Sequence, residues 1–338
     1  MLKVDIEKRL GAFQLRAKFT AESGRLALLG ASGSGKSVTL RCIAGILMPD
    51  RGTVELDGVT LFDSERRIHL PPQKRQVGYL FQQYALFPNM TVEKNIRCAI
   101  RTGSAREKDE QAAEKIRAFR LTGLEKKLPA QLSGGEQQRV ALARILASEP
   151  RAILLDEPLS ALDGFLRWEL EQELSELLSD FGGPVVWVSH DLDECCRNCA
   201  RVSVMENGKA GEPVAMDALL QSPATVGAAR LTGCRSFFPA ERCREGARIP
   251  ALGLLLPDAP QRSFTTVGIP SDAINMTGGS LACTVRSVTR GRLSASVLLL
   301  PDGGGTDAML CAELPRDAAI APGDTVRIAI RPGQVLYL

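Results

Sequence analysis

The octapeptide GASGSGKS at residues 30–37 constrains the fold of this chain more than any other stretch. It matches the pattern G-x-x-x-x-G-K-[ST], follows the apolar run RLALL (25–29) and precedes the helical stretch VTLRCIAGIL. Glycines at a strand-to-helix turn let backbone N–H groups surround phosphate oxygens at the positive end of a helix. The pattern predicts an α/β domain with a phosphate-binding loop, and a glycine-rich turn that binds nothing is the structural alternative.

The residue types in this loop indicate a nucleotide with a metal ion. The Lys36 ammonium is suited to the β and γ phosphates, and the Ser37 hydroxyl is suited to Mg²⁺. ATP and Mg²⁺ are therefore the predicted cofactors. The residues expected at the nucleotide are Gly30, Ala31, Ser32, Gly33, Ser34, Gly35, Lys36, Ser37 and Val38.

Two acidic residues follow a second buried strand. Asp156 and Glu157 come directly after the run AILL (152–155), at the edge of an α/β sheet where ligands bind. Asp156 is the expected Mg²⁺ ligand, together with Ser37, and Glu157 is the expected base that polarises the attacking water. The structural alternative is a pair of acids that cap the helix after Pro158.

Gln82 and His190 also lie at strand ends. Gln82 follows the strand VGYL and is expected to contact both the metal and the attacking water, although Gln83 competes for that role. His190 ends VVWVSH and is expected to contact the γ phosphate. Taken alone, a single histidine is more often structural.

A second glycine turn opens the stretch LSGGEQQRVALARIL (132–146). Ser133 and Glu136 have the spacing of a capping box, which explains a plain helix start. Two adjacent glycines are not explained by a cap, because they weaken a helix while exposing N–H groups at its positive end. Since the chain already has one helix start for its own nucleotide, Ser133, Gly134 and Gly135 are predicted to bind the ATP of a neighbouring copy.

The pattern of strands and helices changes along the chain. Residues 1–230 alternate apolar runs with helical stretches, and a helical subdomain is expected at about 95–140, where Ala112, Ile116 and Phe119 share one face. Residues 231–338 carry short alternating segments broken by glycine and proline, such as TVRIAIRP (325–332). This C-terminal part is predicted to be a small all-β, barrel-like accessory domain.

Composition limits the partners and the compartment. The 338 residues carry 42 Lys and Arg against 39 Asp and Glu, a net charge of +3, so a nucleic-acid partner is not expected. No apolar stretch is long enough to span a bilayer and the first residues do not read as a signal peptide. Nine cysteines without a disulfide-like pattern fit a reducing compartment. These features favour a cytoplasmic protein.

As an ordered set, the motifs GASGSGKS, Gln82, LSGGEQQRV, ILLDEP, SALD and SHD resemble the ATP-binding subunits of ABC transporters. The resemblance covers about two thirds of the chain and implies a P-loop NTPase fold of the ABC type. It implies that Glu157 is the catalytic base, that His190 senses the γ phosphate and that Asp163 helps to transmit the state of the site across a homodimer. An aromatic residue that stacks on adenine is also implied; Phe13 is the candidate, and a core phenylalanine is the alternative.

The resemblance further implies an enzyme that couples ATP hydrolysis to solute import. Two separate membrane permeases would be its partners, with a substrate-binding protein acting indirectly, and the chain would sit peripherally on the cytoplasmic face of the membrane. The segment 84–96 would contact the permease, and the alternative is that Leu86 and Phe87 fill the core. The C-terminal tail resembles the small barrels appended to molybdate and sulfate importer subunits, and this resemblance implies molybdate or tungstate as the favoured cargo, with sulfate, iron, polyamine and sugar importers left open. A non-transport ABC ATPase and an anion-sensing regulatory protein are the alternatives from other classes.

Overall fold

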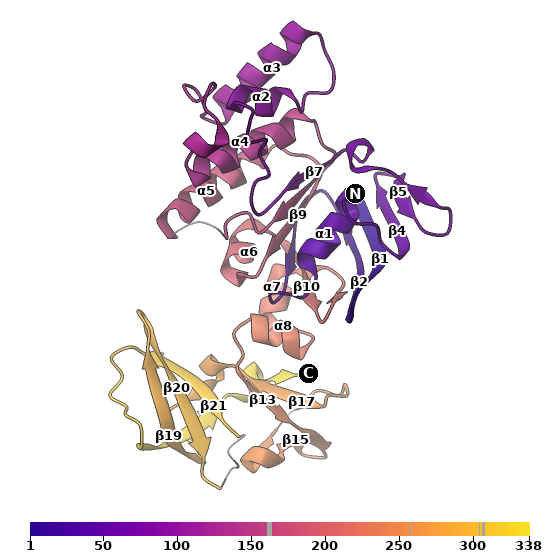
Figure 1. Ribbon diagram of the computed structural model, residues 1–338. Coiled ribbons are helices and arrows are strands. Elements are labelled where there is room, and N and C mark those ends of the chain that lie inside the picture. Colours follow the sequence, from indigo (N-terminus) through magenta and orange to yellow (C-terminus); the bar gives the residue numbers. More distant parts are fainter. Residues whose placement is uncertain (161–163, 258, 304, 306–307) are drawn as a thin grey trace. The chain divides into compact units, whose positions relative to one another are not determined.

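The computed structural model describes residues 1–160, 164–257, 259–303, 305 and 308–338. The chain forms two compact units, Met1–Met216 and Asp217–Leu338 (Figure 1). The boundary expected from the sequence lies near residue 230. The units divide earlier because helix α8 (Val226–Leu231) packs against strand β17 of the C-terminal unit.

The N-terminal unit is built on one large sheet with the strand order β6-β5-β4-β1-β2-β11-β10-β3-β9-β8-β7, and β12 pairs with β10. One half is antiparallel; the strands from β3 to β7 are parallel. The strands are β1 (Leu2–Leu10), β2 (Phe13–Ala21), β3 (Gly24–Leu29), β4 (Arg51–Leu56), β5 (Val59–Asp63), β6 (Ile68–His69), β7 (Val77–Leu80), β8 (Ala152–Asp156), β9 (Pro184–Ser189), β10 (Arg201–Glu206), β11 (Lys209–Ala210) and β12 (Val214–Ala215).

The parallel strands explain where the polar motifs meet. The runs predicted as buried strands form β3, β8 and β9, and every residue of β8 and β9 is buried. Because parallel strands end at the same edge of a sheet, the segments that follow β3, β7, β8 and β9 are brought to one side. These segments carry the glycine loop, Gln82, Glu157 and His190.

Helices surround this sheet and form a separate group at one end. The helices are α1 (Lys36–Ala44), α2 (Val92–Arg97), α3 (Ala105–Ala118), α4 (Gly134–Ala147), α5 (Gly164–Leu177) and α6 (Leu192–Asn198). Helix α7 (Met216–Gln221) begins at the boundary between the units and lies almost entirely in the second. Figure 1 shows α2, α3 and α4 together, away from the antiparallel strands. The predicted apolar face of α3 is confirmed, since Ala112, Ile116 and Phe119 are buried. Within the described ranges, no helix is both long and apolar enough to cross a bilayer.

After helix α8, the sheets of the C-terminal unit are all antiparallel, as predicted. Its three sheets have the orders β13-β17-β23, β14-β15-β16 and β18-β22-β19-β20-β21. Its buried core includes Ile328 of β22, with Val326 and Ile330 of the same strand packed against it. The strands are β13 (Ser236–Pro239), β14 (Glu241–Cys243), β15 (Gly246–Ile249), β16 (Leu254–Leu256), β17 (Thr266–Ile269), β18 (Ile274–Asn275), β19 (Leu281–Arg290), β20 (Ser294–Pro301), β21 (Leu310–Pro315), β22 (Thr325–Ile330) and β23 (Leu336–Tyr337).

A buried arginine holds the far end of α1. Arg75 is 1% exposed and donates to the carbonyl oxygens of Cys42 (2.9 Å) and Ile43 (2.7 Å) at the last turn of the helix. Its Nε donates to the Leu70 carbonyl at 2.8 Å. The guanidinium therefore satisfies the helix-end carbonyl of Ile43 and gives a second donor to that of Cys42, which also accepts from the Gly45 N–H at 3.2 Å. It joins the segment before β7 to the helix that follows the glycine loop.

Replacing Arg75 with methionine is expected to destabilise the chain by about 2 kcal/mol, because the helix-end carbonyls lose a buried donor. The thermal unfolding midpoint of the full chain measures this. Arg66→Met is the control, since Arg66 is an exposed arginine of the same unit. Equal midpoints for the two variants would contradict the role given to Arg75.

Candidate functional site

The glycine loop between β3 and α1 is pressed tightly against its neighbours. A Cβ atom added at Gly30 would lie 2.3 Å from the carbonyl oxygen of Met205 in β10. Gly35 has a φ of 107°, and a Cβ there would lie 2.9 Å from the ring of Phe13. A side chain at Gly30 would clash with the backbone of β10, and one at Gly35 would be strained by the positive φ, so the backbone itself lines the loop.

Lys36 turns its ammonium group back into this loop. Its Nζ donates to the carbonyl oxygens of Gly30 at 2.7 Å and Ala31 at 3.0 Å, and the residue is 4% exposed. Burial lowers the pKa of Lys36, and the nearby carboxylates of Glu157 and Asp156 oppose that shift. A cation thus lies between the loop and the two acids.

The loop has the properties of a phosphate cradle. Helix α1 begins without a side-chain cap at Gly35, so its first N–H groups are left to a ligand or to water. The Ser34 hydroxyl is buried and has no hydrogen-bond partner in the described structure. A bare helix start, a buried unpartnered hydroxyl and an ammonium group together suit an anion with several oxygen atoms.

Asp156 at the end of β8 accepts a hydrogen bond on each carboxylate oxygen. The Ser37 hydroxyl donates to Oδ1 at 2.7 Å, and the Tyr79 hydroxyl donates to Oδ2 at 2.7 Å. The carboxylate is 4% exposed. The hydroxyl of Ser37 and the carboxylate of Asp156 form an oxygen donor pair that suits Mg²⁺.

Glu157 and His190 face each other at the ends of neighbouring strands. His190 Nδ1 lies 3.4 Å from Glu157 Oε1, and the side chains are 56% and 19% exposed. Glu157 has a φ of 49°, which is unusual for a residue with a side chain, and its N–H donates to the Val188 carbonyl of β9 at 3.1 Å. The strained turn directs the glutamate away from the buried strand and toward the exposed histidine.

Gln82 follows β7, and its side chain reaches the segment that follows β8. Its Nε2 lies 3.5 Å from the Ser160 hydroxyl, which donates to the carbonyl of Glu157 at 3.0 Å. Gln82 and Gln83 are both exposed. This contact places the Gln82 side chain next to the segment that carries Glu157, which supports Gln82 as the glutamine that contacts the metal and the attacking water. The choice of Gln82 over Gln83 for that role stays a prediction.

The segment after Gln82 is anchored to α4. Tyr84 and Ala85 have φ values of 57° and 46°, and Arg144 donates to both of their carbonyls, at 3.2 and 2.9 Å. The Arg144 guanidinium also lies over the Phe87 ring, 5.3 Å from its centre. Arg144 therefore attaches residues 82–87, the glutamine loop, to the helix that begins at the second glycine turn.

The second glycine turn is a capped helix start separate from the first site. The Ser133 hydroxyl accepts from the Glu136 N–H at 3.3 Å, and the Ser133 N–H donates to Glu136 Oε2 at 2.7 Å, so the predicted capping box is confirmed. Gly134 is exposed. Within the described part of the chain, no hydrogen bond or ion pair joins this turn to the loop at residues 30–37.

The structure does not place two of the predicted site residues, Phe13 and Asp163, among the groups at the phosphate-binding loop in their expected roles. Phe13 is half-buried, packs against the core and touches the glycine loop from the side of β2. That packing matches the core alternative, and adenine stacking by Phe13 stays a prediction. Asp163 lies outside the described residues.

Sequence reasoning missed Tyr79 and Ser160. Ser160 sits in the motif SALD, which was assigned only through its aspartate. Tyr79 stands in an apolar strand, where an aromatic residue is expected to fill the core. A tyrosine three residues before the candidate Gln82 is a weak signal, since only the strand order reveals that β7 lies next to β8.

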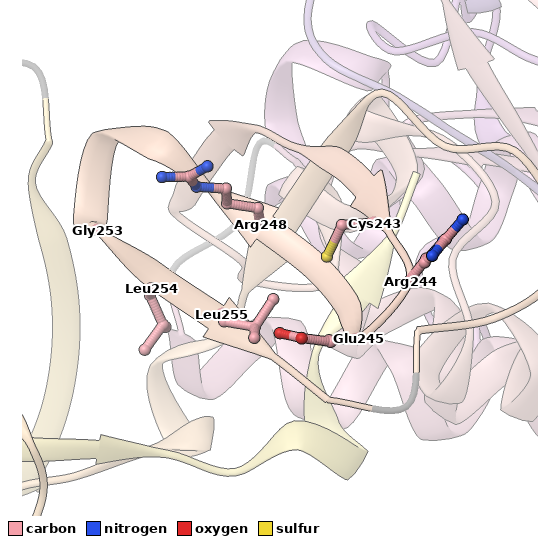
Figure 2. Close-up of a pocket in the computed structure, with 7 residues that line it drawn as sticks. All are labelled: Cys243, Arg244, Glu245, Arg248, Gly253, Leu254 and Leu255. Carbon is pink, nitrogen blue, oxygen red and sulfur yellow. The ribbon is translucent and has the colours of Figure 1, made fainter.

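The C-terminal unit has a surface pocket of about 490 Å³ on the β14-β15-β16 sheet. Figure 2 shows the guanidinium groups of Arg244 and Arg248 pointing away from each other, with Glu245 also at the rim. An oxyanion site needs donors that converge on one point. This pocket does not have that arrangement.

Comparisons with known proteins give consistent results. The family profile described as ABC transporter matches residues 16–160. The chain is 37% identical over 223 residues to the molybdenum import ATP-binding protein ModC of Paramagnetospirillum magneticum, an alignment that covers 66% of this chain and 61% of that protein. It is 44% identical over 211 residues to the molybdate/tungstate import ATP-binding protein WtpC of Archaeoglobus fulgidus, covering 62% of this chain and 85% of that protein.

One relative is matched along almost the whole chain. The sulfate/thiosulfate import ATP-binding protein CysA 2 of Chromobacterium violaceum is 35% identical over 349 residues, covering 97% of this chain and 92% of that protein. Among solved structures, an ATP-binding cassette seen as a dimer with ADP and phosphate has a TM-score of 0.54 and 29% identity, covering 64% of this chain and 99% of that one. The fold, the ordered motifs and this near full-length match agree: the chain belongs to the family of ABC transporter ATP-binding proteins.

Proposed function

We propose that this chain is the ATP-hydrolysing subunit of an ABC import complex. The observation that carries the proposal is the meeting of Lys36, Asp156, Glu157 and His190 beside a bare helix start at one edge of the parallel strands. An anion cradle, a metal-type carboxylate and a base facing a histidine are the parts needed for attack of water on a phosphate.

The chemistry follows from these positions. The loop N–H groups and Lys36 bind the β and γ phosphates, which places the γ phosphate near Glu157 and His190. Ser37 and Asp156 would hold Mg²⁺, with Gln82 as a further ligand; the ion neutralises charge on the phosphates when it is bound. Glu157 accepts a proton from the attacking water, and His190 donates a hydrogen bond to the γ phosphate.

The second glycine turn supports a composite site. Its first-turn N–H groups lie at a positive helix end, and no described contact directs them to the loop of the same chain. In the proposed homodimer, Ser133, Gly134 and Gly135 bind the γ phosphate of ATP held by the partner, and Asp163 helps to transmit the state of the site between the copies. ATP then favours the closed dimer, and loss of the γ phosphate favours opening.

Import of molybdate or tungstate is the proposed task. Support comes from relatives named for molybdenum, molybdate or tungstate import. Two membrane permeases and, indirectly, a substrate-binding protein are the proposed partners, with the chain on the cytoplasmic face of the membrane. The proposed ATPase domain comprises residues 1–230, with its helical subdomain at about 95–140. The proposed accessory domain comprises residues 231–338.

Sulfate import is the second candidate. It is favoured by one specific observation, the 97% coverage of this chain by a sulfate/thiosulfate import relative, which includes the C-terminal unit.

Replacing Glu157 with glutamine is expected to lower kcat by about 100-fold or more, because the amide cannot accept the proton of the attacking water. ATP binding should persist and a dimer with ATP should accumulate, as size-exclusion chromatography with Mg-ATP would detect. The matched control is Glu149→Gln, since Glu149 is an exposed glutamate with a φ of 47°. Wild-type turnover in the Glu157 variant would show that Glu157 is not the catalytic base.

Replacing Ser133 with arginine is expected to leave ATP affinity unchanged and to lower turnover by about 100-fold, because a bulky side chain blocks the partner's phosphate. Ser104→Arg is the control. Ser104 forms the same capping box with Glu107 at the start of α3, so both variants lose an equivalent helix cap. An equal loss of turnover in the two variants would indicate a stability effect and contradict the shared site.

The cargo is tested in the assembled complex. When the chain is co-purified with its membrane partners in vesicles, molybdate delivered by the binding protein should stimulate ATP turnover and sulfate should not. Stimulation by sulfate alone would favour the second candidate over molybdate.

A further inference from the structure

The hydrogen bond between Tyr79 and Asp156 has no role in the mechanism above. The Tyr79 hydroxyl donates to Oδ2 of Asp156 at 2.7 Å, while Ser37 donates to Oδ1 at the same distance. The carboxylate is therefore held at both oxygens by donors from two different elements, β7 and α1. Side-chain torsions of aspartate are broad near the carboxylate, so two donors restrict a group that is otherwise free to turn.

Tyr79 is itself rigidly held. Strand β7 runs parallel to β8, with Tyr79 opposite Leu154, two residues before Asp156. The tyrosine is 9% exposed, and its ring packs on Phe81 with the ring centres 4.3 Å apart. Strand β7 is the edge strand of the sheet and contacts α1 and α4. The buried ring fixes the position of its hydroxyl, and the hydroxyl in turn fixes the carboxylate.

A competing partner for the carboxylate lies nearby. Lys36 is close enough to interact electrostatically with Asp156, and the Lys36 ammonium is held by the loop carbonyls. If the carboxylate turned toward Lys36, both charges would be drawn away from the phosphates and from the metal. The hydroxyl of Tyr79 opposes this rotation because it holds Oδ2 on the side of β7.

We propose that Tyr79 is a positioning residue that aims Asp156 at the metal ion of the nucleotide complex. This inference rests on the proposed function, because the metal accompanies ATP. Hydrogen-bond partners behind a metal-ligating carboxylate orient it, and their loss typically lowers metal affinity by about 10- to 100-fold. In this proposal Tyr79 acts through Asp156, to which its hydroxyl donates, and not on the nucleotide or the reacting water.

The test is Tyr79→Phe in the full chain, which removes the hydroxyl and keeps the ring. Mn²⁺ binding to the protein with ADP is measured by electron paramagnetic resonance, and the Mg²⁺ concentration for half-maximal ATP turnover is measured in parallel. Both constants should weaken by about tenfold or more. Nucleotide binding in EDTA should stay at the wild-type value, which shows that the cradle is intact.

The matched control is Tyr84→Phe, which removes the hydroxyl of a second buried tyrosine in the same unit, 8% exposed and 3.5 Å from the Gln138 amide oxygen. Its Mn²⁺ affinity should equal that of the wild type. Unchanged Mn²⁺ affinity in the Tyr79 variant would overturn the inference. The inference would also be overturned if the variant lost nucleotide affinity in EDTA by the same factor as it lost Mn²⁺ affinity. If the wild-type chain itself bound no nucleotide, the proposed function would fail and this inference with it.

Discussion

The buried carboxylate of Asp156 is the group on which the arrangement of the proposed active site depends. Burying a carboxylate is costly unless its oxygens are hydrogen-bonded, and here each oxygen has a hydroxyl donor. One donor opens α1, the other stands on β7, and the acceptor ends β8. All three elements must keep their register for the bonds to form, so the geometry of the site is tied to the packing of the whole parallel half of the sheet.

The loops at this edge hold backbone conformations that side chains rarely adopt. Glu157, Tyr84 and Ala85 all have positive φ values, and each costs conformational free energy. Neighbouring contacts hold them, since the Glu157 N–H bonds to β9 and Arg144 holds the carbonyls of Tyr84 and Ala85. Strain near the reacting groups thus depends on packing elsewhere, and Arg144 makes the position of the glutamine loop depend on α4.

The parts of the fold that local patterns determine could be predicted from the sequence. A capping box, an apolar strand and a glycine-rich turn each involve a few neighbouring residues, and the start of α4, strands β3, β8 and β9, and the bare start of α1 follow from them. Tyr79, Arg75 and Arg144 could not be assigned this way. Their partners lie far along the chain, at Asp156, Cys42 and Ala85, and the strand order that brings them together leaves no local signal.

The two helix starts differ in a way that fits separate roles. Helix α1 has no side-chain cap, and a lysine of its first turn bonds the loop carbonyls, so this start is completed by a ligand with negative charge. Helix α4 is capped by its own Ser133 and Glu136, and the hydrogen bonds from Ser133 lower the pKa of Glu136, which means that the cap stabilises the charged carboxylate. A helix start already capped and partly neutralised is stable alone and attracts an anion only weakly. In the proposed dimer, α4 therefore adds its contacts only when the partner brings a full triphosphate, and releases them readily once the γ phosphate is lost.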